Sequence, residues 1–470
     1  MDTPIFKGLK KYIEEENISF HTPGHKGRND IINWKKYIPS IDLTEVEGLD
    51  NLQDPKGIIL ESQKLAAKTF KAKETFYSVN GSTGGIYIAL SAITNPGDKV
   101  LIQRNCHKSV YNGIILNNLI PKYIYPKYNE KYNILTGINP LDIENSLKEN
   151  PDIVAVVITY PNYYGICSDI EKIVDIVHKY NKILLVDEAH GSHLIFSKNL
   201  PMSALESGAD IVVQSTHKTL PSFTQTSMIH VGTSRVDIDK LKDMYNLYQT
   251  TSPSYIFMAS LDIARAYMED VGRNQLELHL KNIEKFRSQV MEIDRISIFE
   301  GDMEDSTIKT IDKTKILINI KGIKGTQLES LLRKKYNIQL EMSDYYYALA
   351  LTTLMNTEED FNNFKNVLED ISIKTDYEEK EDFCFKEFKP IVSKPIREGF
   401  FSKKASCSLK ESVGKVSASF IIPYPPGVPI IAPGEIITKD IYEYILFLKQ
   451  NDIEIVGLLD YNREKINVVI

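Results

Sequence analysis

Three apolar, β-branched runs of strand length lie at residues 152–159, 182–188 and 209–215. Helical spacing of apolar positions marks residues 61–71, and a second such segment begins at Asp169. Continuous apolar strands that alternate with helices are typical of a parallel sheet with helices on both faces. Ligands of such sheets bind beyond the carboxyl ends of the strands. The pattern therefore predicts an α/β fold with its site at that edge.

Changes in the pattern divide the chain into four parts. The first is a polar arm punctuated by Gly and Pro, and the second carries the alternating strands and helices. The third has the pattern of a small α+β unit, and the fourth begins with a charged, linker-like stretch at 374–383. We place these parts at residues 1–60, 61–300, 301–373 and 374–470. A chain of 470 residues is too long for a single core, which agrees with this division.

Composition narrows the class of protein. A net charge of -7 and a pI near 5.8 lack the basic balance of a nucleic-acid-binding protein. The four cysteines lie far apart without a Cys-x-x-Cys pair, which indicates a reducing compartment rather than a disulfide framework or a zinc site. The N-terminus shows no apolar signal region, and the longest apolar runs have strand length. We expect a cytoplasmic protein without membrane or nucleic-acid partners.

Lys218 and Asp187 are the first candidates for chemistry. Lys218 follows the apolar run 209–215, and Asp187 closes the run 182–188. A lysine in a pocket of low dielectric has a lowered pKa, so that its neutral amine can attack an aldehyde. A buried aspartate needs a partner, and the protonated nitrogen of a pyridine ring would be one. The alternative for Asp187 is that it caps the following helix.

A small-residue turn, Gly81-Ser82-Thr83-Gly84-Gly85, lies between a predicted strand and a predicted helix. Such a turn lets backbone amides approach a phosphate, and Ser215 and His217 beside Lys218 would suit the same group. Alone, this turn is only a weak indication of a phosphate site. Together with Lys218 and Asp187 it becomes the expected phosphate-binding turn. The chain contains no G-x-x-x-x-G-K-[ST] motif, so the Asp-Glu-Ala-His sequence at 187–190 does not indicate a helicase.

Histidines gather in these motifs: six of the nine are at positions 21, 25, 107, 190, 193 and 217. His107 follows the apolar run 99–103, where an imidazole can stack on a flat ring, although a lone histidine is more often structural. Clustered histidines can also bind metal. The spacings here fall in Gly-rich loops rather than on helices, and we therefore predict no metal site.

Six motifs resemble the Orn/Lys/Arg decarboxylase family in its short form, similar to biosynthetic members from bacteria. They are HTPGHKG (21–27), NGSTGG (80–85), CHKS (106–109), DEAHGSH (187–193), STHKTLPSFTQTSMIH (215–230) and PYPPGVPIIAPGE (423–435). The likeness covers essentially the whole chain. It implies the fold-type-I, aspartate-aminotransferase-like architecture of pyridoxal-phosphate enzymes, and a homodimer or dimer of dimers with shared active sites. A departure is Asn162, where the family more often has Thr.

The resemblance also implies residue roles. Lys218 would carry pyridoxal 5′-phosphate as a Schiff base, Asp187 would meet the pyridine nitrogen, and His107 would stack on the ring. The remaining cofactor contacts would come from Ser82, Thr83, His190, Ser215 and His217. The expected catalytic residues are thus Lys218, His107 and Asp187.

The expected reaction is decarboxylation of a basic amino acid, with arginine to agmatine in polyamine and spermidine biosynthesis favoured by the resemblance. Lysine or ornithine decarboxylation, a fold-type-I aminotransferase or lyase, and an inert binding protein remain alternatives. An aminotransferase would grip the substrate carboxylate with arginine, for which Arg397 is a candidate. The acid that meets the basic end of the substrate stays open among Asp50, Asp54, Asp344 and Glu411.

Overall fold

The computed structural model describes residues 9, 12–28, 36, 38, 40–375, 389–423, 427–460 and 462–470. Most of the predicted linker at 374–383, together with Tyr424, Pro425 and Pro426 of the PYPPG motif, lies outside the described residues. Within the described part of the chain, no helix is both long and apolar enough to cross a membrane.

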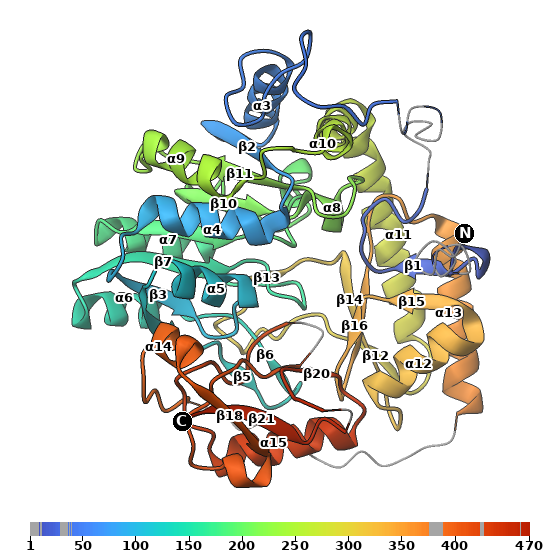
Figure 1. Cartoon of the computed structure of the whole chain (residues 1–470). Coiled ribbons are helices and arrows are strands. Elements are labelled where there is room, and N and C mark those ends of the chain that lie inside the picture. The colour runs from blue at the N-terminus through green and yellow to red at the C-terminus, as the bar shows by residue number, and fades with distance from the viewer. Residues whose placement is uncertain are drawn as a thin grey trace, which may run out of the picture.

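A seven-stranded sheet forms the centre of the described structure, in the order β2-β11-β10-β9-β7-β3-β4 (Figure 1). Its strands are β2 (Glu74–Ser78), β3 (Lys99–Gln103), β4 (Ile120–Ile124), β7 (Ile153–Thr159), β9 (Ile183–Asp187), β10 (Ile211–Gln214) and β11 (Ser227–Val231). β11 is antiparallel to β10 and β2, and the other neighbouring pairs are parallel. The carboxyl ends of β2, β3, β7, β9 and β10 therefore share one edge.

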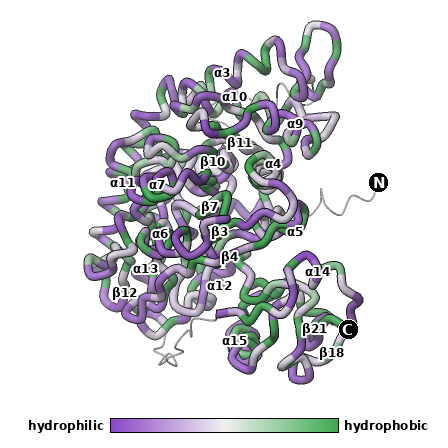
Figure 2. The backbone as a smooth tube through the Cα atoms, turned by 90° about the vertical axis from the view of Figure 1, so that its left-hand side faces the viewer, coloured by the Kyte–Doolittle hydropathy of each residue, from purple (hydrophilic) through white to green (hydrophobic). Residues whose placement is uncertain are grey.

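Helices cover both faces of this sheet. Figure 2 shows α4 (Gly81–Ile93), α5 (Lys108–Leu116) and α9 (Ile238–Tyr248) on one side, and α6 (Pro140–Glu149) and α7 (Ile170–Lys179) on the other. Asp169 begins α7 as predicted, because its side chain accepts a hydrogen bond from the Lys172 amide. α3 (Ile58–Thr69) and α10 (Tyr255–Tyr267) lie beyond the β2 edge (Figure 1).

A second, smaller sheet follows along the chain in the order β12-β14-β17-β16. Its antiparallel strands are β12 (Ile296–Ile298), β14 (Lys315–Ile320), β16 (Met342–Ser343) and β17 (Ala348–Leu351). Its helices are α11 (Arg273–Met291), α12 (Gly325–Tyr336) and α13 (Glu358–Lys374). A π-helical turn, η2 (Met268–Gly272), separates α10 from α11.

Strand β1 (Ile18–Phe20) of the N-terminal arm joins this smaller unit. It pairs in parallel with β15 (Ile338–Leu340). Phe20 is fully buried, and its ring packs against Phe361 and Phe364 of α13. The sequence pattern suggested only a separate polar arm, because the partner strand lies more than 300 residues away.

The C-terminal part has its own small core and forms a lobe below the large sheet (Figure 2). It contains α14 (Ile396–Phe401), β18 (Lys404–Ser408), η3 (Lys410–Ser412), β19 (Ile422–Pro423), α15 (Lys439–Gln450), β20 (Ile455–Val456) and β21 (Lys465–Val469). Arg104 joins it to the large unit, since its guanidinium donates to Glu435 at 3.1 Å and to the carbonyls of Pro429 and Ile430.

Short elements complete the described structure. They are β5 (Tyr128–Asn129), β6 (Ile134–Leu135), β8 (Ile166–Cys167), β13 (Thr310–Ile311), η1 (Leu194–Phe196) and α8 (Thr216–Thr219). The strands predicted at 152–159, 182–188 and 209–215 are confirmed as β7, β9 and β10. The antiparallel strand β11 follows the segment that carries Lys218 and is not among the predicted strands.

Candidate active site

The predicted site residues follow strands that end at one edge of the large sheet. Asp187 is the last residue of β9, Lys218 lies on α8 directly after β10, and His107 follows β3. Ser82 and Thr83 lie in the first turn of α4, which follows β2. Parallel strands bring these positions together, although up to 136 residues separate them along the chain.

Lys218 is the centre of this group. Its Nζ lies 3.0 Å from Nε2 of His190. Burial lowers the pKa of Lys218, and the opposing charges of Asp187 and Glu341 do not restore it. A lysine with a lowered pKa is neutral in a larger fraction of molecules, and the neutral amine is the nucleophile that condenses with an aldehyde.

Asp187 provides the negative charge opposite this amine. The carboxylate is almost fully buried, and its Oδ1 accepts a hydrogen bond from the Ala189 amide at 3.2 Å. Burial raises its pKa, whereas Lys218 acts in the opposite direction. A buried carboxylate is costly without a cationic or hydrogen-bonding partner, so Asp187 is suited to hold a proton on a ligand placed between it and Lys218.

His190 links Lys218 to an aromatic side chain. Its ring meets Tyr163 edge to face, with 5.2 Å between the ring centroids. Burial holds the pKa of His190 well below its ordinary value, and the nearby charge of Lys218 adds to this effect, so the imidazole is neutral. Its Nδ1 is buried and has no hydrogen-bond partner among the described residues.

His107 presents a second neutral imidazole. Burial lowers its pKa to about 4, with a further contribution from Lys218. Its Nδ1 accepts a hydrogen bond from the Ser109 amide at 3.2 Å, and this bond fixes the ring at the start of α5. An uncharged, oriented imidazole is able to stack on a flat heteroaromatic ring.

The N-terminus of α4 offers an anion cradle. Asn80 makes no side-chain cap, so the first amides of the helix are not satisfied by it, and Gly81 has a φ of +67° that a side chain would strain. The Ser215 hydroxyl donates to the Ser82 hydroxyl at 2.6 Å, which places one hydroxyl from each strand end beside this turn. A helix N-terminus with hydroxyls is suited to a phosphate.

His217 points toward a backbone carbonyl, since its Nδ1 lies 2.9 Å from the oxygen of Thr226. Burial lowers its pKa to about 4. Its own carbonyl accepts the Gly24 amide at 2.6 Å, so the HTPGH motif of the N-terminal arm lies against the segment that carries Lys218. A Cβ atom at Gly24 would lie 2.4 Å from the Leu220 oxygen, which explains the glycine there.

These residues fit pyridoxal 5′-phosphate. The buried Lys218 amine suits the aldehyde of that cofactor, and the buried Asp187 carboxylate, whose charge acts on Lys218, suits the ring nitrogen. The neutral imidazole of His107 suits the ring face, and the first turn of α4 with its hydroxyls suits the phosphate. The buried, unpartnered Nδ1 of His190 is a further polar atom that a ligand would satisfy.

The predicted acids lie in different settings. The Asp50 carboxylate accepts backbone amides at the start of α3, Asp54 forms an exposed ion pair with Lys56, and Glu411 bonds to Ser408 at the surface. Arg397 donates to the carbonyls of Ile115 and Leu116 at the end of α5. Asp50, Asp54, Glu411 and Arg397 therefore each have a hydrogen-bond or ion-pair partner away from Lys218.

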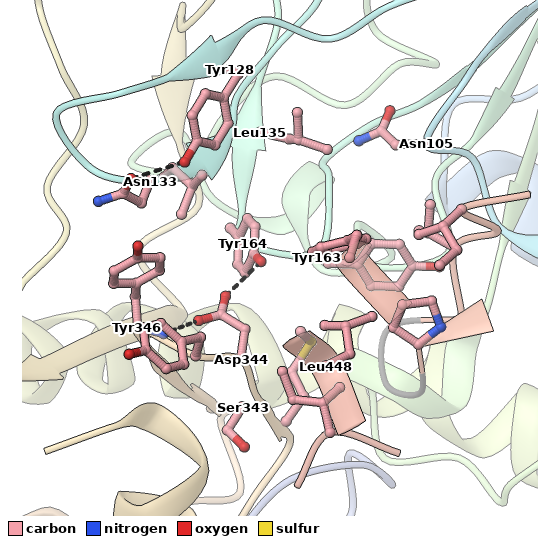
Figure 3. A pocket seen from close by; sticks show the side chains of 18 of the residues that line it. Asn105, Tyr128, Asn133, Leu135, Tyr163, Tyr164, Ser343, Asp344, Tyr346 and Leu448 are labelled. Atoms are coloured by element: carbon pink, nitrogen blue, oxygen red, sulfur yellow. Dashed lines mark hydrogen bonds between the residues drawn. The ribbon is translucent and has the colours of Figure 1, made fainter. Parts of the chain in front are cut away.

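Asp344 lies elsewhere, in a cavity of about 190 Å³ whose lining includes six tyrosines (Figure 3). Its carboxylate accepts the Tyr164 hydroxyl at 2.8 Å and the Tyr346 amide at 2.8 Å. The neighbouring Tyr163, whose ring contacts His190, also lines the cavity. The cavity thus adjoins the group around Lys218.

Sequence reasoning missed Glu341. Its carboxylate accepts the Thr22 amide at 2.7 Å, and its charge acts on Lys218. No local pattern marked it, because Glu341 reaches the site through the pairing of the N-terminal arm with β15. Asn162, the departure from the family pattern, has a structural role: its Oδ1 accepts the amides of Tyr164 and Ile166.

Comparisons with known proteins agree with this geometry. Residues 3–317 match the Orn/Lys/Arg decarboxylase major domain, and residues 394–459 match the Orn/Lys/Arg decarboxylase C-terminal domain. A protein of Bacillus anthracis named arginine decarboxylase is 35% identical over 100% of this chain and 97% of its own length.

The solved structures agree in fold. The constitutive lysine decarboxylase of E. coli has a TM-score of 0.78 at 20% identity, with 100% of this chain and 82% of that chain covered. An alanine–glyoxylate aminotransferase from Nostoc sp. has a TM-score of 0.58 at 16% identity, over 75% of this chain and 94% of that chain. The predicted fold-type-I architecture is thereby confirmed, and the chain belongs to the Orn/Lys/Arg decarboxylase family.

Proposed function

We propose that this protein is a pyridoxal-phosphate enzyme that decarboxylates L-arginine to agmatine. The observation that carries the proposal is the buried Lys218 amine at the end of β10, 3.0 Å from the neutral His190 imidazole and under the charge of Asp187. The family supports decarboxylation of a basic amino acid. The choice of arginine rests on full-length relatives that carry that name.

In this proposal Lys218 holds the cofactor through its amine and Asp187 keeps the ring nitrogen protonated. His107 stacks on the ring, and Ser82, Thr83, Ser215 and His217 surround the phosphate. The bound cofactor supplies an electron sink for the pair of electrons left when the substrate loses carbon dioxide. The protein sets which substrate bond breaks by orienting the substrate, and it excludes water from the buried edge of the sheet.

Lys218 and His190 are the groups placed to handle protons. The imidazole is neutral, and its Nε2 faces the amine at hydrogen-bond distance. A proton on Nζ of Lys218 can therefore be donated in a hydrogen bond to Nε2 of His190, which takes up that proton itself only transiently because its pKa is held low. Groups of this kind protonate and deprotonate a bound substrate most effectively when their pKa values lie near the working pH.

The basic end of the substrate needs a carboxylate. Glu341, whose charge acts on Lys218, and Asp344, in the adjoining cavity, are the two acids that the arrangement favours. Replacement of each in turn separates them. We expect Glu341→Gln or Asp344→Asn to raise the KM for arginine at least tenfold, a loss of about 1.4 kcal/mol in binding. Glu411→Gln is the matched control, because Glu411 bonds to Ser408 at the surface.

An aminotransferase of the same fold is the second candidate. This chain shares its fold with the Nostoc aminotransferase, and that likeness shows the fold alone. Arg397, the candidate for gripping the α-carboxylate, instead donates to carbonyls at the end of α5. We therefore place decarboxylation first.

We further propose that the protein acts in polyamine biosynthesis in the cytoplasm, as a homodimer or dimer of dimers with shared active sites. Light scattering of the purified protein tests the oligomeric state. A monomer that retains full activity contradicts the shared site.

The central test is release of carbon dioxide from arginine, lysine and ornithine without any added keto acid. We expect arginine to give the highest kcat/KM, and a clear preference for lysine contradicts the proposal. Lys218→Ala serves as the control that removes the amine. Borohydride reduction of the loaded enzyme, followed by peptide mapping, should place the pyridoxyl group on Lys218.

A further inference from the structure

Lys315 is a buried cation that the proposed chemistry does not use. It begins β14 in the small sheet, and its side chain is fully buried. Its Nζ donates to Oδ2 of Asp312 at 2.6 Å. An ammonium removed from water in this way is costly unless it is paired, and even a paired buried charge often adds little to stability compared with apolar side chains of similar size.

Asp312 ties this cation to the loop after β9. Its carboxylate also lies 3.1 Å from Nε2 of His193, and its Oδ1 accepts the hydroxyl of Thr314 at 2.7 Å. Burial would raise the pKa of Asp312, but the charges of Lys315 and His193 more than offset it and hold the pKa far below its ordinary value. Asp312 is therefore ionised, and the Lys315–Asp312 pair joins β14 to the loop that contains His193.

The same ammonium makes a second contact, with the residue that faces Lys218. Nζ of Lys315 donates to the backbone oxygen of His190 at 3.1 Å. The ring of His190 in turn lies 3.0 Å from Nζ of Lys218. His190 is thus held at its main chain by one buried lysine and approaches the other with its side chain. A Cβ atom at Gly165 would lie 3.2 Å from Lys315, so the lysine stem is also packed closely.

We propose that Lys315 is a positioning residue, which fixes the loop of His190 from the small sheet and thereby sets the His190 imidazole against the Lys218 amine. The proposal rests on the proposed function, since it concerns the same amine. It assigns a role in the active site to a residue of the small unit that does not line the cavity of Figure 3.

An electrostatic consequence follows from the same placement. The charged and titratable groups that act on Lys218 and His190 are Asp187, Glu341, Lys315, His107 and Asp312. Burial is the largest cause of the lowered pKa of Lys218. The charge of Lys315 lowers that pKa further, while Asp187 and Glu341 act to raise it. Removal of the Lys315 charge should therefore favour the protonated form of the Lys218 nitrogen.

The experiment compares Lys315→Met with Lys313→Met. Met keeps the length of the side chain and removes the charge, and Lys313 is a neighbouring lysine whose partner, Glu284, is exposed at the surface. Spectrophotometric titration of the loaded enzyme follows protonation of the Lys218 nitrogen. In Lys315→Met we expect the midpoint to move to higher pH and kcat to fall by about tenfold to a hundredfold with little change in KM. Lys313→Met should match the wild type in both.

Lys315→Met leaves Asp312 buried without its cation and could fail to fold for that reason. A second variant, Lys315→Met/Asp312→Asn, therefore removes both charges, and the midpoint should again move to higher pH. A wild-type midpoint and kcat in the folded variants, or a midpoint that moves to lower pH, overturns the proposal. If the wild-type protein itself shows no visible absorbance with pyridoxal phosphate, the proposed function fails instead, so the two failures are distinguishable.

Discussion

Nζ of Lys218 and Nε2 of His190 lie 3.0 Å apart in a buried pocket where burial lowers the pKa of both groups. Neither partner is therefore forced to carry a charge, and the neutral imidazole is placed to accept the hydrogen bond of the amine. This relationship gives His190 a chemical part in addition to any contact with the cofactor.

Replacement of His190 tests whether its imidazole takes part in proton transfer beside Lys218. We expect His190→Leu to lower kcat by about a hundredfold, because a proton acceptor beside Lys218 is lost. Borohydride mapping should still locate the pyridoxyl group on Lys218. His190→Gln keeps a polar partner but cannot take up a proton, and it should be equally impaired. Recovery of activity in His190→Gln would show that His190 only orients the amine.

Acid stability should depend on His230. This residue of β11 is fully buried, bonds to Thr75 at 2.8 Å, and has a pKa lowered to about 3 by burial. Its pKa in the unfolded chain is about 6.5, so the unfolded state binds more protons below that pH. The stability contributed by His230 is complete above pH 6.5 and is lost progressively as the pH falls toward 3.

Urea unfolding at pH 7.5 and pH 5 measures this loss. On acidification the wild type should lose about 2 kcal/mol more than His230→Gln, at about 1.4 kcal/mol per pH unit below 6.5. The measurement at pH 7.5 gives the intrinsic cost of the substitution, because His230 is neutral there in both states. Equal losses in the two proteins would contradict the assignment.

The ion pair between Arg104 and Glu435 should hold the C-terminal lobe to the large unit. Both side chains are buried, and Arg104 also donates to the carbonyls of Pro429 and Ile430. Arg104→Met leaves Glu435 buried without its cation and should cost about 3 to 5 kcal/mol in the free energy of unfolding. Arg104→Met/Glu435→Leu should recover part of that loss. A double variant with a lower free energy of unfolding than Arg104→Met would argue against the pairing.

Asp50 should serve stability rather than substrate binding. Its carboxylate accepts the amides of Gly57 and Ile59 at the start of α3. Asp50→Ala should therefore cost about 1 to 2 kcal/mol in thermal or urea unfolding and leave the KM for arginine unchanged. Asp50→Asn, which keeps an acceptor oxygen, should cost less. A raised KM for arginine without loss of stability would indicate that Asp50 binds the substrate.

The parts of the fold that the sequence predicted are those with local signals. The apolar runs that became β7, β9 and β10 are recognisable alone, and the Asp169 cap needs only its next three residues. Lys218 and Asp187 meet because parallel strands align their carboxyl ends, a rule that requires no knowledge of packing.

Contacts set by distant packing could not be predicted in this way. Lys315 looks like the polar flank of an apolar strand, and nothing within ten residues indicates that it is buried against the His190 loop. The charge of Glu341 acts on Lys218 although 123 positions separate the two residues along the chain, and no local pattern indicates that effect.

The pairing of β1 with β15 also bears on biosynthesis. Ile18 emerges from the ribosome early, whereas its partner Ile338 follows 320 positions later. At about 5 to 20 residues per second the first strand waits roughly 15 to 60 s for its neighbour. β1 can therefore pair with β15 only after Ile338 has been translated, whereas the HTPGH motif, whose Gly24 amide donates to His217, finds its partner about 120 residues earlier.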